Sequence, residues 1–218
     1  DENVIRTVNT RVTQAKGRYC TLSHSWGGAK LLKTALDNVE KFLLKGIETS
    51  ELENSKLKEA IQISRSLDVR YIWIDSLCTI QDPPRDFKTE DALMRNGFRN
   101  SYCNIVAAGS DASKRGGLLR GRELDALLDS FIYSQGWVFQ GKYFVALPTP
   151  AFGISGSKIY LTFTERMISP RILYFARIQI FWDCGTISAC ESLPSGFPLL
   201  LDHLAATDWH WRGHLAYN

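Results

Sequence analysis

The chain has 218 residues, of which 44% are hydrophobic and 22% are charged, and it carries a net charge of +3 at pH 7. These proportions are typical of one soluble globular domain, and the small net charge argues against a nucleic-acid-binding surface. The five cysteines are an odd number without a C-x-x-C pair, which indicates a reducing compartment rather than a disulfide framework. The sequence contains no signal-peptide core and no apolar run of about 18 residues. It therefore predicts an intracellular, cytoplasmic protein without a membrane span.

The first half of the chain alternates between strand and helix patterns. Apolar runs predict strands at 18–23, 69–74 and 103–108, and apolar residues at helical spacing predict helices at 30–45, 56–67 and 87–100. The run at 69–74 is apolar enough to be buried on both faces of a parallel sheet. The alternation predicts an α/β fold, in which a mostly parallel sheet is flanked by helices through right-handed crossovers.

The second half is less regular and rich in aromatic residues. Strands are expected at 136–140 and at 171–184, and a hairpin is one interpretation of the latter. We expect an irregular, aromatic-rich, β-containing C-terminal part. Near its end, Asp208, His210 and His214 form a loose cluster without the carboxylate spacing of a metalloprotease, so we predict no metal site.

The stretch from Tyr71 to Asp82 concentrates the groups that can do chemistry. An apolar strand delivers Asp75, Cys78, Gln81 and Asp82 to its C-terminal end, where open α/β sheets build their sites. Asp75 can bind a ribose hydroxyl, orient a histidine or cap the next turn, and these alternatives stay open. Cys78 has no histidine nearby in the sequence, so a structural thiol competes with a ligand-binding role.

A second group of candidate ligand-binding residues follows the first strand. Ser23, His24, Trp26 and Gly27 occupy a strand-to-helix turn, where backbone N–H groups can meet an anionic ligand. Ser23 and His24 are adjacent on a strand and therefore point in opposite directions, which argues against a catalytic dyad. Packing roles are the alternative for His24 and Trp26.

Five blocks in a fixed order connect these candidates to a known family. They are YCTLSHSWG (19–27), RYIWIDSLCTIQD (70–82), a segment at 90–108 that ends in NSYCNIVAA, Gly116-Gly117-Leu118, and GWVFQ (136–140) followed by ERMISPRILYF (165–175). With these blocks the chain resembles the fungal heterokaryon-incompatibility (HET) domain. The resemblance implies a signalling and interaction domain in fungal non-self recognition and regulated cell death, acting by self-association or through other cell-death proteins.

The resemblance also implies a flavodoxin-like sheet of the kind found in TIR domains, some of which cleave NAD with a glutamate. On this alternative, NAD is the ligand, and Glu90 and Asp75 are the catalytic candidates. Glu90 lies ahead of the third predicted strand, whereas the TIR glutamate follows the corresponding strand. A first-turn glutamate favoured by the helix dipole is the structural alternative, and no G-x-G-x-x-G or P-loop motif supports an enzyme independently.

The family pattern G-W-x-x-Q-E-R is interrupted here by residues 141–164, which begin Gly-Lys-Tyr and end Leu-Thr-Phe-Thr. The length and both ends match a translated short fungal intron, and a genuine loop insertion is the alternative. We therefore predict a lead-in at 1–17, a HET-like domain at 18–192 with this atypical insertion, and a tail at 193–218. An intron would make the chain an inactive gene-model product. Because the chain starts at Asp1 rather than methionine, we also expect a fragment.

Sequencing the transcript tests the intron. We expect the dominant message to lack the codons for 141–164, because splicing would join Gln140 to Glu165 and restore the family pattern. A dominant message that retains these codons would show a genuine insertion.

Overall fold

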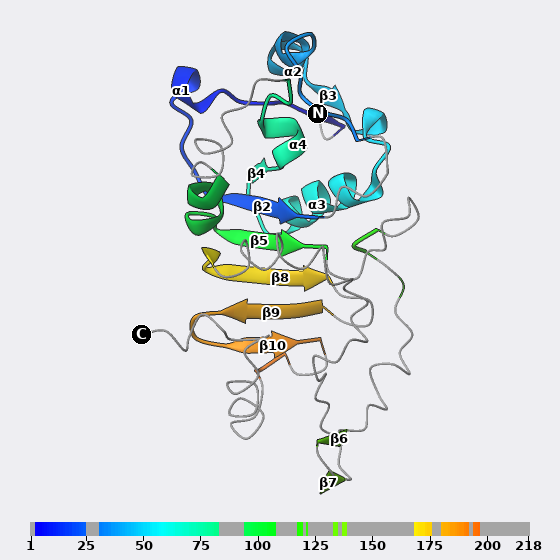
Figure 1. Ribbon diagram of the computed structural model, residues 1–218, viewed down its shortest axis with the longest axis vertical. Coiled ribbons are helices and arrows are strands. Elements are labelled where there is room, and N and C mark those ends of the chain that lie inside the picture. The colour runs from blue at the N-terminus through cyan, green and yellow to red at the C-terminus, as the bar shows by residue number, and fades with distance from the viewer. Residues whose placement is uncertain are drawn as a thin grey trace.

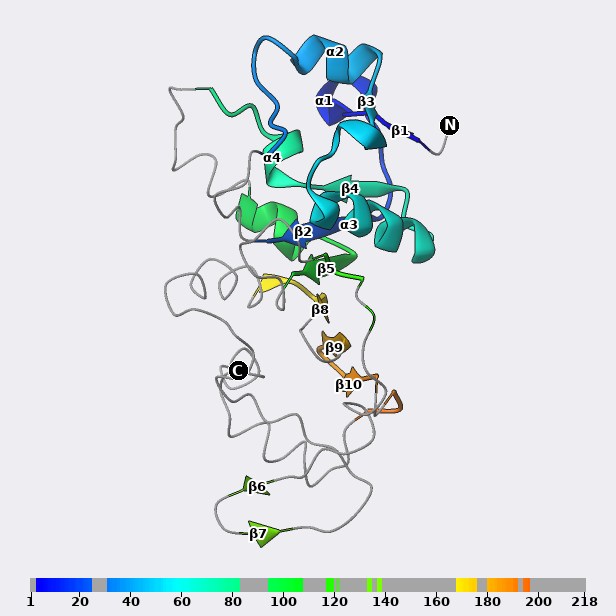
Figure 2. The same cartoon turned by 90° about the vertical axis from the view of Figure 1, so that its right-hand side faces the viewer.

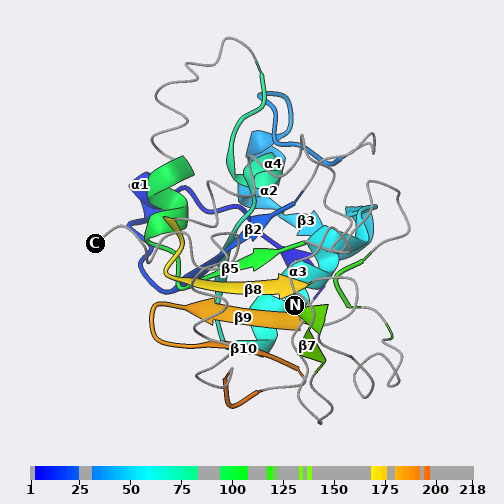
Figure 3. The ribbon, with the colours of Figure 1, turned by 60° about the horizontal axis from the view of Figure 1, so that its bottom comes forward.

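The computed structural model describes residues 3–24, 31–82, 94–107, 117–119, 121, 168–175, 180–191 and 194–196, and of 133–134 and 137–138 the strand backbone only. A six-stranded sheet in the order β10-β9-β8-β5-β2-β4 forms the centre of the described fold (Figure 1, Figure 3). Two short antiparallel pairs accompany it: β1 (Val4–Ile5) pairs with β3 (Ile47–Glu48), and β6 (Tyr133–Ser134) pairs with β7 (Trp137–Val138).

The central sheet is mostly parallel, as the sequence predicts. The parallel strands are β4 (Tyr71–Trp73), β2 (Tyr19–Ser23), β5 (Cys103–Val106) and β8 (Arg171–Phe175). The sheet continues through β9 (Ile180–Cys184) and β10 (Ser188–Cys190), each antiparallel to the strand before it. β8 and β9 form a hairpin, which confirms the interpretation of 171–184.

Among the described residues, α3 (Ser55–Ser66) is the longest helix, and the other helical segments are short. They are α1 (Thr10–Thr13), α2 (Val39–Leu44), the 3-10 turn η1 (Thr49–Glu51), α4 (Asp75–Cys78) and a helical stretch at 94–99. α3 begins where the Asn54 side chain accepts a hydrogen bond from the Lys56 N–H at 2.9 Å, a typical N-cap. Its apolar face is buried as predicted, except at Leu67, which follows the last helical turn and is exposed.

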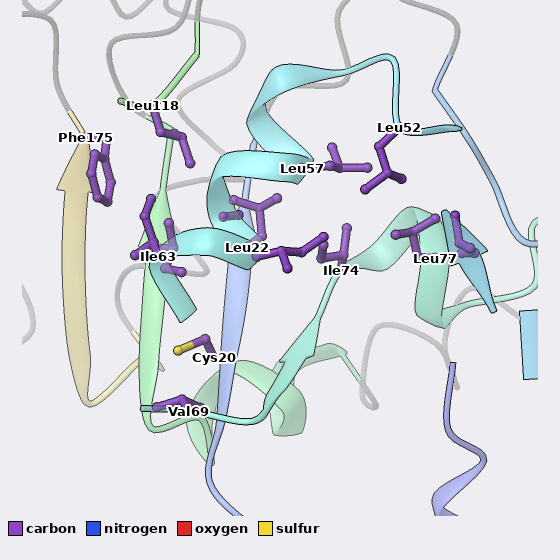
Figure 4. Close-up of a cluster of buried hydrophobic side chains, with 14 of the residues drawn as sticks. Cys20, Leu22, Leu52, Leu57, Ile63, Val69, Ile74, Leu77, Leu118 and Phe175 are labelled. Atoms are coloured by element: carbon purple, nitrogen blue, oxygen red, sulfur yellow. The ribbon is translucent and has the colours of Figure 1, made fainter. Parts of the chain in front are cut away.

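The two faces of the sheet are covered by different helices. Alternate residues of β2 and β5, among them Cys20, Leu22 and Ile105, join Ile74 and the buried side of α3 in the main hydrophobic core (Figure 4). On the opposite face, Trp73 and Phe98 pack edge to face with ring centroids 5.4 Å apart, so residues 94–99 cover that side. Helices therefore lie on both faces, as α/β architecture requires.

The prediction of a helix over 30–45 is wrong for most of its length. Among the described residues of that range, only Val39–Leu44 are helical. Thr34 instead forms a parallel bridge with Ile80, and its N–H donates to the Ser76 carbonyl at 2.8 Å. The Asn38 side chain then accepts from the Ala35 N–H at 2.9 Å, which closes a turn ahead of α2. Tertiary pairing thus overrides the helical spacing of leucines, and Leu36 is 70% exposed.

Of two further expectations, the burial of β4 on both faces is met in part, and the aromatic-rich C-terminal part is not confirmed. Both faces of β4 are covered, but β4 is the last strand of the sheet, so its three residues are only half-buried. Aromatic residues do line the C-terminal hairpin, where Phe175 and Phe181 are buried. In the part of the chain that the structure describes, however, the edge-to-face ring pair joins Trp73 and Phe98, outside that hairpin.

Candidate functional site

The order of the parallel strands marks one position at the carboxyl edge of the sheet. From β2 the chain adds β4 on one side and then β5 on the other, so successive connections diverge between β2 and β5 (Figure 2). Ligands of open α/β sheets bind outside the strand ends at such a point. α3 runs back from this edge, because its last turn leads directly into β4. We call His24, Lys56, Glu59 and residues 117–119 the switch-point cluster.

His24 follows β2 and is half-buried. Its Nε2 is inaccessible to solvent and has no hydrogen-bond partner among the described residues. Burial and then the positive charge of Lys56 lower the pKa of His24 to about 4, so the imidazole is neutral at physiological pH. Lys56 itself is only 4% exposed. A buried polar atom without a partner is costly, which makes His24 an unusual residue for a purely structural position.

Glu59 connects α3 to the segment after β5. Its Oε2 accepts hydrogen bonds from the N–H groups of both Leu118 and Leu119, the latter at 2.7 Å. A Cβ on Gly117 would collide with this carboxylate, so the Glu59 side chain can take this position beside a glycine. Lys56 and Glu59 are three residues apart on α3 and so lie on neighbouring positions of one helix face.

Ser23 points to the other face of the sheet and is used structurally. Asn104 of β5 accepts from the Thr21 hydroxyl at 3.0 Å and donates through Nδ2 to the Ser23 hydroxyl at 3.0 Å. All three side chains are at most 1% exposed. The predicted opposite orientation of Ser23 and His24 is confirmed, since Ser23 faces Asn104 while His24 faces Lys56 of α3.

Most polar groups of the Tyr71–Asp82 stretch are engaged within the fold. The Gln81 side chain donates to the carbonyls of Asp75 and Thr79 at 3.2 and 3.1 Å. The Asp82 carboxylate accepts from the Leu36 N–H at 2.5 Å, and the Thr34 hydroxyl donates to the Leu77 carbonyl at 2.7 Å. Asp75 opens α4, where a carboxylate is favoured by the helix dipole. These contacts clamp α4 to residues 34–38 and do not converge on a common point.

Cys78 is a poor nucleophile. Although part of the residue is exposed, its sulfur turns back toward the strand, where the Ile74 N–H donates to Sγ at 3.4 Å. Loss of hydration, reinforced by the Asp75 carboxylate, raises the pKa of the Cys78 thiol to about 11. The thiol is therefore protonated at neutral pH, whereas nucleophilic cysteines react as thiolates.

A comparison with protein-family models identifies the chain. A model described as "Heterokaryon incompatibility protein (HET)" matches residues 19–132, slightly more than half of the chain. The chain belongs to the heterokaryon incompatibility family. Searches of curated proteins and of solved structures found no match. The matched part of this HET domain includes β2, α3, β4, α4, β5 and the contact of Glu59 with the N–H groups of Leu118 and Leu119.

Several predicted residues lie outside the described part of the HET chain. These are Trp26, Gly27, Glu90, the histidines near the C-terminus and the insertion at 141–164. The insertion and the blocks at 136–140 and 165–175 also lie beyond the residues matched by the family model. The intron and the inactive-product interpretation therefore stay predictions.

Sequence reasoning missed three residues of the site and its support: Lys56, Glu59 and Asn104. Lys56 and Glu59 look like solvated positions of an amphipathic helix, and Asn104 lies within an apolar strand run. One signal was present, because Gly116-Gly117-Leu118 is a recognisable block of the HET pattern. Its partner, Glu59, is 59 residues from Leu118 in the chain, and nothing local in the sequence connects them.

Two searches of the described residues bear on other classes of site. Within the ranges given above, no group of three or more His, Cys, Asp or Glu side chains is arranged to hold a metal ion. The same part of this HET chain contains no helix that is long and apolar enough to cross a membrane.

The buried neutral His24 predicts acid sensitivity. Its pKa is about 4 in the folded state and about 6.5 when unfolded, so the unfolded state binds the proton more strongly between these values. The contribution of neutral His24 to the free energy of unfolding is fully present above pH 6.5. It is lost as the pH falls toward 4, and the free energy of unfolding then decreases by about 3 kcal/mol in total. We expect urea unfolding of the wild type to show this loss relative to the His24→Gln variant. Parallel pH profiles of the two proteins would contradict the assignment.

Proposed function

We propose that the chain is an incompatibility-type signalling and interaction domain that acts in the fungal cytoplasm in non-self recognition and regulated cell death. Membership in the HET family, which implies a function related to heterokaryon incompatibility, is the observation that carries this proposal. The domain acts by self-association or by contact with other cell-death proteins.

The contacts of the family signature support an interaction domain over an enzyme. Gln81, Asp82 and Thr34 are engaged with backbone groups of the α4 clamp, and Cys78 is held as a protonated thiol. Side chains that are committed to backbone contacts are not available to substrate. The signature thus preserves a fold, and recognition then depends on surfaces that the fold presents.

The sheet order supports a TIR-like interpretation of the fold. The four parallel strands lie in the order second, first, third, fourth along the chain, which is the order of the corresponding strands in flavodoxin-like sheets. TIR domains share that architecture, and some of them assemble into signalling oligomers. This likeness supports self-association as the first mechanism to test.

Induced expression in a filamentous fungus tests the cell-death role. We expect expression of the wild-type chain to lower the viability of the fungus. We expect expression of the Asn104→Leu variant to leave viability unchanged, because Thr21 and Ser23 lose their shared partner and the sheet is destabilised. Glu53→Gln, at an exposed position, is the matched control and retains the effect. Sedimentation of the purified wild type reports self-association. Full viability at equal levels of soluble protein would contradict the proposal.

NAD cleavage is the second candidate function. His24 has a buried Nε2 without a partner in the described part of the chain, and it lies at the strand edge where flavodoxin-like sheets bind their ligands. This observation favours a small-molecule site. NAD would be the substrate, with Glu90 and Asp75 as candidates for catalysis and glutamate as the residue that stabilises an oxocarbenium-like state.

Nicotinamide release from NAD tests this activity. If the domain is an NAD glycohydrolase, concentrated protein releases nicotinamide, Glu90→Ala abolishes the release, Asp75→Ala reduces it, and Glu53→Gln leaves it unchanged. Absence of release from folded wild-type protein at every concentration would eliminate the enzyme and leave the interaction domain.

A further inference from the structure

The segment 117–119 has the geometry of an anion site that is filled from within the chain. Two consecutive backbone N–H groups, those of Leu118 and Leu119, converge on the same Glu59 oxygen. Consecutive N–H groups that converge in this way form a concave binding site for anions, and many phosphate sites are built on them. Gly117 has no side chain, and the Glu59 carboxylate fills the space that a Cβ there would take.

The backbone of this site is fixed by the hydrophobic core on one side, and the other side is open to solvent. Leu118 is 2% exposed and belongs to the main core, so the backbone that carries the two donors is fixed. Leu119 is 45% exposed and Glu59 is only half-buried, so the occupied side faces the surface. The Glu59 carboxylate sits at the end of a flexible side chain. It can therefore leave the two N–H groups without unfolding residues 117–119.

The neighbouring groups favour a more highly charged anion than one carboxylate. Lys56, one turn before Glu59 on α3, carries a positive charge on the same side of the helix. The buried Nε2 of His24 offers a hydrogen-bonding atom that has no partner in the described chain. A phosphate group has three terminal oxygens and up to two negative charges, and so can engage more donors at once than a carboxylate can.

We propose that residues 117–119 bind the phosphate group of a small phosphorylated ligand, and that Glu59 occupies this site as an internal competitor when the ligand is absent. Ligand binding releases Glu59 and thereby breaks the hydrogen bonds between α3 and the segment after β5. The step is an exchange of hydrogen-bond partners and involves no covalent change. A soluble ligand can thus break the contact between Glu59 and residues 117–119, whether or not the domain cleaves NAD.

Titration with inorganic pyrophosphate at constant ionic strength tests the proposal, with backbone amide signals as the readout. The Glu59→Gln variant keeps a carbonyl oxygen for the two N–H groups but removes the competing charge. We expect the variant to bind pyrophosphate about tenfold more tightly than the wild type, because a neutral acceptor competes less strongly for the two N–H groups than a charged one. The Leu118 and Leu119 amide signals should shift saturably. Glu53→Gln removes the same charge from an exposed position and should retain wild-type affinity.

A second substitution locates the binding to the segment itself. Adding Gly117→Ala to Glu59→Gln places a methyl group in the anion space and should abolish the gain. If Glu59→Gln does not fold, Glu59→Asp replaces it, since the shorter carboxylate cannot reach both donors. Equal affinity in the wild type and the Glu59 variant, or shifts confined to other amides, would overturn the proposal and leave Glu59 as a structural contact.

Discussion

The position of β2 between β4 and β5 is the constraint on which the rest of this structure depends. Because β2 has a neighbour on each side and a helix layer on each face, every group on it must be either apolar or paired. Cys20 and Leu22 meet the first condition against α3, and Thr21 and Ser23 meet the second through Asn104. A slip of one residue between β2 and β5 would turn both hydroxyls into the hydrophobic core. The buried amide thus specifies the register of the central strands.

The family signature at residues 71–82 mainly satisfies a similar constraint at β4, the strand next to β2 at the edge of the sheet. β4 ends the sheet and has a partner on one side only, so the chain beyond it needs another support. Residues 34–38 provide that support by bonding to the carbonyls and side chains of the α4 region. A pattern that looks like a catalytic cluster in the sequence is therefore largely a structural clamp. This explains why the polar side chains of the 71–82 stretch lie close in the sequence but do not point toward a common site.

The switch-point cluster differs from that clamp in how its polar groups are satisfied. His24 has a buried nitrogen that no described residue partners, and Glu59 binds backbone donors that belong to a distant part of the chain. Both features lie at the edge of the sheet, where the strand order diverges. The signalling by assembly that we propose requires some contact whose state can change. A half-buried charged side chain is easier to displace than any part of the apolar core.

The sequence by itself determined the elements whose signals are local: β2, α3, β5, the β8–β9 hairpin and the mixed α/β class. Their apolar periodicities and caps lie within a few residues of each other, so tertiary structure had only to agree with them. It also determined the family, through blocks in a fixed order. Only the tertiary structure decided that residues 31–38 are not helical, that β4 is an edge strand, and that Glu59 reaches Leu118. Each of these depends on partners tens of residues away, which no local pattern encodes. The burial of His24 belongs to the same class, since its altered pKa arises from α3 packing above the end of β2.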